Sequence, residues 1–347
     1  MKIVSLFAAD REGSTRDESA RGAGTFGTAL AFACALVVAL APARALAQAY
    51  PVKPIRIIVP LAAGGPPDFV ARTMAQHLTT GLGQQVIVEN RPGAGGTIGT
   101  AAAAKSPGDG YTLLLASTTS LSISPSLYAN PGYDPGTSFA PISLIATAPF
   151  LVVVHPSLPV KSLKELIALA KSRPGELNYA SGGNGSPLHI AGEMLKTGAG
   201  VQLVHVSYKG AAPALIDLLS GRVQVMVEQL LPLGPHIQNG KIRPLAVASP
   251  KRHPQLPDLP TAAEGGLPGY EVIAWMGMVA PRGASGEVIK RLNGELVRAL
   301  QAKEVRDGLF NQGLQPVGNS PEAFSAFIST ESARWSRAVK SSGAKVD

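Results

Sequence analysis

Three glycine-rich segments are the residues whose types and spacing could do chemistry. They read LAAGGPPD at 61–68, NRPGAGG at 90–96 and SGGNGS at 181–186, and each stands between an apolar run and a helical pattern. Small residues let a ligand approach backbone N–H groups, and a helix N-terminus attracts anions. The first and third segments therefore predict anion binding. For the second, a tight turn that needs the positive φ of glycine explains the pattern equally well.

The glycine segments do not match a nucleotide-binding motif. Gly93 and Gly95 follow an apolar run, but the dinucleotide fingerprint needs its third glycine at position 98, which is Ile98; Gly99 comes one residue late. The chain also lacks the G-x-x-x-x-G-K-[S/T] pattern of phosphate-binding loops. We therefore expect no nucleotide and no other cofactor.

Catalytic and metal-binding patterns are also missing. The sequence contains no G-x-S-x-G and no H-E-x-x-H motif. His189 and Glu193 stand four apart and would make half of a metal site, but a hydrogen bond of His189 near the helix start is the preferred interpretation. We read the other scattered histidines as surface or core residues: His155, His205, His236 and His253. The sequence predicts no catalytic centre and no metal site.

Two further side chains have alternative interpretations. Asp68 either caps the helix that follows Pro67 or contacts a ligand, and capping is favoured because acidic residues stabilise a first helical turn. Trp275 lies in an apolar run, where core packing is favoured over ligand contact. Neither residue alone predicts a function.

The elements around these segments predict an α/β fold. Apolar strands at 54–60, 85–89 and 111–116 alternate with helical patterns, which is typical of a parallel sheet with crossover helices. A second α/β block runs from about 143 to 249. A strand at 271–279 and helices from 287, 305 and 321 follow; Ser320 and Pro321 mark the start of the last one.

This order predicts two lobes. If the helical tail packs back on the first block, the chain crosses between lobes near 148–156 and again near 270–280. We therefore expect a hinged two-lobe protein with two interlobe crossovers and a cleft between the lobes. The predicted lobes are 50–150 with 274–347, and 151–273.

The N-terminal residues predict export. The apolar run at 27–42 is followed by the small-residue sites Ala45-x-Ala47 and Ala47-x-Ala49, which together indicate a cleavable signal peptide over 1–49. A retained membrane anchor is the alternative, but the run is short for a membrane span. Cleavage would remove Cys34, the only cysteine, and a cysteine-free protein suits an oxidising compartment.

Composition limits the class of partner. The chain has 347 residues, 16% of them charged and 5% aromatic, which excludes a disordered chain and disfavours a base-stacking surface. Its net charge of +8 favours anionic partners. No run of Lys and Arg exceeds two residues and no recognition motif is present, so we expect no nucleic-acid partner.

Stretches along nearly the whole chain after residue 50 resemble the Bug family, the extracytoplasmic solute receptors of tripartite tricarboxylate transporters. The stretches are PVKPIRIIVP (51–60), AGGPPD (63–68), ENRPGAGGTIG (89–99), GDGYTLL (108–114), YASGGNGS (179–186) with His189, YKG (208–210), LPDLPT (256–261) and W-x-G (275–277).

The resemblance implies a Venus-flytrap architecture with two α/β lobes, similar to that of other periplasmic binding proteins. It also implies a periplasmic receptor that binds a small organic carboxylate through backbone amides and ordered water, with transporter membrane components as partners. We expect this receptor to be a monomer. It assigns one side of the cleft to Ala63, Gly64, Gly65 and Asp68. It assigns the other side to Ser181, Gly185, Ser186 and His189. Further cleft residues, implied more weakly, are Ser117, Thr118, Tyr208, Lys209 and Gly210.

Two departures from the family pattern leave the ligand open. Leu61 stands where the family often has an aromatic residue, and Val227 with Glu228 stands where it often has Phe-Asp. A receptor that reports to a signalling partner would look the same in sequence. A secreted hydrolase, the other alternative, would need the nucleophile and base that are missing.

Overall fold

A computed structural model describes residues 50–344. The predicted signal peptide and its cleavage sites lie outside the described residues. Among those residues, none of the helices combines the length and the apolar character that crossing a membrane requires.

The first sheet begins with three parallel strands. β1 (Ile55–Val59) lies between β2 (Val86–Asn90) and β3 (Thr112–Ser117), as the predicted β–α–β order requires. The connections are α2 (Pro66–Leu82), which ends at Gly83 in the left-handed conformation, and α3 (Thr97–Ala104). All six residues of β3 are buried, because helices cover both faces of the sheet.

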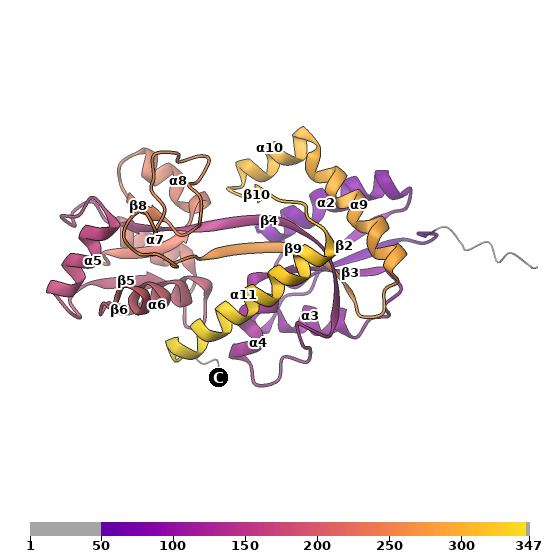
Figure 1. Ribbon diagram of the computed structural model, residues 1–347, viewed down its shortest axis with the longest axis horizontal. Coiled ribbons are helices and arrows are strands. Elements are labelled where there is room, and N and C mark those ends of the chain that lie inside the picture. Colours follow the sequence, from indigo (N-terminus) through magenta and orange to yellow (C-terminus); the bar gives the residue numbers. More distant parts are fainter. Residues whose placement is uncertain (1–49, 345–347) are drawn as a thin grey trace, which may run out of the picture. The chain divides into compact units, whose positions relative to one another are not determined.

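Two long strands carry the chain between the two parts (Figure 1). β4 (Phe139–Val154) pairs antiparallel with β9 (Ile273–Pro281), which in turn pairs with β3. Beyond Phe150, β4 continues into the second part, where it pairs with β7 (Val225–Gln229) and β8 (Arg243–Val247). The two predicted crossovers are therefore confirmed, and the fold is the predicted two-lobe α/β architecture.

The second part repeats the parallel arrangement. β5 (Asn178–Ser181) lies between β6 (Val204–Ser207) and β7 in a parallel order. The helices around these strands are α5 (Leu163–Ser172), α6 (Pro187–Ala199), α7 (Ala211–Leu219) and α8 (Leu230–Gln238). Ser162 caps α5 by accepting a hydrogen bond from the amide of Glu165.

The last elements cover the first sheet. They are α9 (Gly286–Gln301), α10 (Lys303–Asn311), the two-residue strand β10 (Gln315–Pro316) and α11 (Pro321–Ser342). The final helix, α11, packs against the cores of both parts, which the sequence did not predict. Its residues Phe324 and Ile328 pack in a core with Trp275, but Trp335, Ala338 and Val339 belong to the core of the second part.

Two regions differ from the sequence-based expectation, the strand β4 and the residues after β3, whereas Trp275 agrees with it. Residues 139–154 form one continuous strand, β4, although the second block was expected to begin at about 143. Residues after β3 form a π-helical turn, η2 (Thr118–Ile123), and a short helix, α4 (Ser124–Leu127). Trp275 is 1% exposed and makes edge-on contacts with Phe324 and Phe327, so it is a core residue, as favoured above.

Candidate functional site

The first glycine loop is folded back on helix α2 by Asp68. The Oδ2 atom of this buried side chain accepts hydrogen bonds from the Gly64 amide (3.0 Å) and from Arg72 Nε (2.9 Å). The bond from Arg72 holds the pKa of the Asp68 carboxyl below its usual range. Asp68 therefore stabilises the start of the helix, and its Oδ1 atom has no partner among residues 50–344.

This bonding decides which amides of the first loop remain available. The Gly64 amide is occupied, and Pro66 and Pro67 have no N–H to give. The amides of Gly65 and Asp68 have no hydrogen-bond acceptor among residues 50–344. Ala63 and Gly64 are exposed, so the loop surface is open to an approaching molecule.

The second glycine segment has a structural role. A methyl group at Gly99 would lie 2.5 Å from the Arg91 carbonyl oxygen, and one at Gly96 would lie 3.2 Å from the Pro60 carbonyl oxygen. Gly93, Gly95 and Gly96 all have positive φ. Here glycine is required for the turn and for close packing against the end of β1, which favours the structural interpretation.

The third glycine loop is held from behind by His189. Ser186 caps α6, its hydroxyl oxygen accepting a hydrogen bond from the His189 amide (3.2 Å). The Gly185 amide donates to His189 Nδ1 (3.2 Å), and the Ser186 amide donates to the Gly183 carbonyl (3.1 Å). Both loop amides are therefore occupied, whereas the Ser186 hydroxyl still has its proton to donate.

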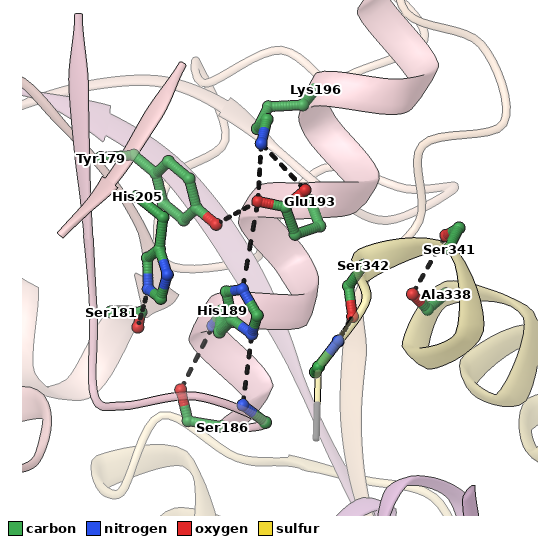
Figure 2. A network of polar contacts seen from close by, with 12 residues as sticks. Tyr179, Ser181, Ser186, His189, Glu193, Lys196, His205, Ala338, Ser341 and Ser342 are labelled. Atoms are coloured by element: carbon green, nitrogen blue, oxygen red, sulfur yellow. Dashed lines mark hydrogen bonds and ion pairs between the residues drawn. The ribbon is translucent and has the colours of Figure 1, made fainter. Parts of the chain in front are cut away.

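Ser181, the first residue of this loop, lies beside a stack of aromatic rings (Figure 2). Its fully buried hydroxyl is 2.6 Å from His205 Nε2. The His205 ring stacks between the rings of His189 and Tyr179, at centroid distances of 4.1 and 4.9 Å. Burial lowers the pKa of His205 to about 4, so this histidine is neutral at pH 7.

The sequence did not single out His205 or Tyr179 as parts of the site. The one available signal was their pairing: β5 and β6 are consecutive parallel strands, and Tyr179 stands directly opposite His205. Without the register of the two strands, the sequence does not show that these two side chains meet.

The weaker candidates are mostly engaged within the protein. Thr118 Oγ1 accepts a hydrogen bond from the Trp275 amide (2.8 Å), and Ser117 Oγ accepts one from the Ser120 amide (3.3 Å). Tyr208 donates its hydroxyl proton to Asp217 Oδ2 (2.8 Å). These contacts stabilise the turns that follow β3 and β6.

The turn at 208–210 brings a second helix start to the third loop. Gly210, with φ of +113°, precedes α7, and its amide donates to the Gly182 carbonyl (3.2 Å). A methyl group at Gly182 would lie 3.2 Å from the Ala211 amide nitrogen. Lys209 is exposed. The N-termini of α6 and α7 therefore meet at this loop, which favours an anion there.

Short contacts connect the loops into one surface. The Asn90 side chain donates to the Leu61 carbonyl (3.2 Å), and Ser124 Oγ donates to the Gly95 carbonyl (2.8 Å). A methyl group at Gly185 would lie 2.8 Å from Leu127 Cδ1. The α4 segment thus touches the second loop and the third. A cavity of about 260 Å³ lies elsewhere, between α8 and the turn at 311–313.

Ionisable groups do not gather at these loops in a metal-binding arrangement. Across residues 50–344, the structure shows no group of three His, Cys, Asp or Glu side chains that could hold a metal ion. The His189 Nε2 atom is 4.0 Å from Glu193 Oε1. That side chain already accepts hydrogen bonds from Tyr179 and Lys196, so the pair is part of a polar network.

The two-lobe sheet with helix N-termini at its glycine loops defines a solute-binding protein. The sequence profile of the tripartite tricarboxylate transporter family receptor, TctC, matches residues 70–344, and the chain belongs to this family.

Solved structures of similar proteins agree with this assignment. The periplasmic binding protein BugD is 40% identical, with a TM-score of 0.69 over 85% of this chain and 99% of its own. A Rhodopseudomonas palustris protein solved with adipate is 38% identical, with a TM-score of 0.72 over 86% and 100%. MatC of R. palustris, with bound malate, is 33% identical, with a TM-score of 0.69 over 84% and 100%.

Proposed function

We propose that this receptor captures a small dicarboxylate between its two lobes, at the first and third glycine loops. The observation that carries the proposal is that the N-termini of α6 and α7 converge on the third loop. The first loop, at the start of α2, offers two amides that have no acceptor among residues 50–344. Helix N-termini favour negative charge. The carboxylates bound by the adipate and malate complexes support this ligand class.

The expected donors differ from those that spacing alone suggests. On the first loop they are the amides of Gly65 and Asp68. On the third they are the Ser186 hydroxyl and the Leu188 amide in the first turn of α6, because the Gly185 and Ser186 amides are already bonded. Ordered water would complete the coordination, since a buried carboxylate needs several hydrogen bonds.

The remaining parts of the proposal concern the setting. We place the receptor in the periplasm after removal of 1–49, acting as a monomer that delivers its ligand to the membrane components of a tripartite tricarboxylate transporter. Its role is binding, not catalysis. The similarity to BugD and the family assignment support this setting.

Calorimetric titration of the mature chain with malate and with adipate tests the proposal. Gly65→Val should abolish binding by blocking the loop; the fold tolerates a side chain there, since the nearest atom to a methyl group is 3.7 Å away. Ser186→Ala should weaken binding by about 1.5–3 kcal/mol, the value of a hydrogen bond to a charged group.

Two variants serve as controls. Ser285→Ala removes the equivalent cap of α9 and should leave binding unchanged, which separates loss of a cap from loss of a ligand contact. Arg72→Gln should change affinity little, because the guanidinium is engaged by Asp68 and Asn90. If Arg72→Gln abolishes binding while Gly65→Val and Ser186→Ala bind normally, an arginine clamp replaces this site.

A further inference from the structure

Glu193 is the centre of a polar cluster that lies behind the third glycine loop (Figure 2). Its Oε1 atom accepts hydrogen bonds from the Tyr179 hydroxyl (2.5 Å) and from Lys196 Nζ (2.8 Å). The same oxygen is 4.0 Å from His189 Nε2. Among the residues that contact Glu193, His189 is the one that accepts a hydrogen bond from the loop backbone, at Gly185.

The hydrogen bond from Gly185 fixes the tautomer of His189. Because the Gly185 amide donates to Nδ1, that nitrogen must be unprotonated, and the ring proton of the neutral imidazole is on Nε2. Nε2–H then points toward the Glu193 carboxylate. The carboxylate favours the tautomer that the loop needs.

We propose that Glu193 and Lys196 are positioning residues that act through His189, and that protonation of His189 releases the third loop and weakens ligand binding. The proposal rests on the function proposed above, since it concerns the same loop. In the neutral ring, Nδ1 accepts the hydrogen bond from the Gly185 amide. In the imidazolium both nitrogens donate, so the acceptor is lost and two N–H groups face each other.

Burial, more than the neighbouring charges, keeps His189 neutral at pH 7 by lowering its pKa. Burial lowers its pKa below the usual value of 6.5, Glu193 opposes this shift, and Lys196 adds to it. His205 stacks on the ring from β6 and is itself neutral. From α11, Arg334 and Arg337 line a cavity beside Met194 and Thr197, farther along α6. Protonation of His189 is therefore expected below pH 6.5.

The added charge does not reverse the expected effect. An imidazolium near an anionic ligand would attract that ligand. The new positive charge would, however, lie 4.0 Å from the Glu193 carboxylate, whose negative charge offsets this attraction. Loss of the Gly185 bond acts directly on the loop backbone. We therefore expect the affinity to fall as His189 takes up a proton.

Malate titrations between pH 8 and pH 5 test the proposal with two variants at position 189. His189→Asn keeps an acceptor near Nδ1 and does not titrate, whereas His189→Leu removes the acceptor. His189→Asn should bind more tightly than His189→Leu at pH 7.5. The ratio of wild-type to His189→Asn affinity should fall about five-fold below pH 6.5, the loss expected for one hydrogen bond. Taking this ratio cancels the titration of malate itself.

The charged neighbours give a second readout that a merely structural role would not produce. In ligand-free protein, NMR should show the Gly185 amide titrating with the His189 ring. Glu193→Gln should move that midpoint to lower pH and Lys196→Gln to higher pH. Lys171→Gln, on α5, is the matched control without a shift.

These outcomes separate the two proposals. If malate and adipate fail to bind at any pH while the Gly185 amide follows His189, the ligand assignment is wrong and the positioning role stands. If the Gly185 amide does not respond to His189, or if wild-type affinity rises relative to His189→Asn on acidification, the positioning role is wrong.

Discussion

Glu228 is a single buried carboxyl whose protonation should control stability. It lies at the end of β7, is 5% exposed, and accepts one hydrogen bond, from the Gln229 amide (2.7 Å). Burial raises its pKa to about 7. Between about pH 4.5 and pH 7 the folded state holds a proton that the unfolded state has lost, so stability falls as pH rises through this window.

Glu228→Gln should therefore stabilise the protein at pH 8 and change little at pH 5. The expected gain at pH 8 is on the order of 3 kcal/mol, because the pKa rises from 4.5 to about 7 and one pKa unit is worth about 1.4 kcal/mol. Urea unfolding at the two pH values measures it. Glu264→Gln is the control: this carboxyl is exposed and paired with Arg252, so its loss should not stabilise. Equal effects of Glu228→Gln at both pH values would contradict the prediction.

At the scale of residues, sequence spacing located the loops but not their free donors. Small residues before a helix N-terminus predicted the loops at 61–68 and 181–186. Which amides remain available depends on side chains that fold back, Asp68 onto Gly64 and His189 onto Gly185. Such choices depend on three-dimensional geometry, and residue types alone do not reveal them.

At the scale of elements, two glycines in regular structure should respond oppositely to the same substitution. Gly277 lies in β9, where a methyl group would come within 2.1 Å of Phe324 Cζ; this ring fills the space against α11. Gly294 lies exposed in α9 with nothing within 4 Å of a methyl group. Only the first glycine is required by packing.

Gly277→Ala should destabilise the protein by about 1–3 kcal/mol, the usual cost of overpacking. Gly294→Ala should stabilise it by about 0.5–1 kcal/mol, because alanine is the better helix former. Thermal unfolding of both variants measures the difference. If Gly277→Ala unfolds at the wild-type temperature, the close contact between β9 and α11 is not as tight as described.

Periodicity predicted most helices and strands, but it failed where proline and packing compete. The sequence LLPLGPHIQ forms α8 although Pro235 lies inside it, because Leu230 and Leu233 pack into the core. Pro149 interrupts the apolar pattern of β4 and yet stands within the strand, opposite Ile273. In both segments, tertiary contacts override the local tendency of proline to end a helix or a strand.

At the scale of the whole described chain, three elements join the two lobes where two were predicted. β4 and β9 are the predicted crossovers. The third is α11, whose Phe324 packs in the core beside Trp275 and whose Trp335 packs in the core of the second part. The alternation of strands and helices predicted the two-lobe order. The double burial of α11 was not predictable, since an amphipathic pattern does not say which core it faces.

Ligand-driven closure is the behaviour that this connectivity predicts. A ligand that contacts loops of both lobes stabilises the conformation in which the loops are closest, and a hinge on β4 and β9 permits the change. Because α11 is anchored in both cores, closure must also change the helix in the segment between Ile328, which lies in one core, and Trp335, which lies in the other. Small-angle scattering should show a smaller radius of gyration with saturating malate or adipate. Gly65→Val at the same concentrations should keep the ligand-free curve, and identical wild-type curves at confirmed saturation would contradict closure.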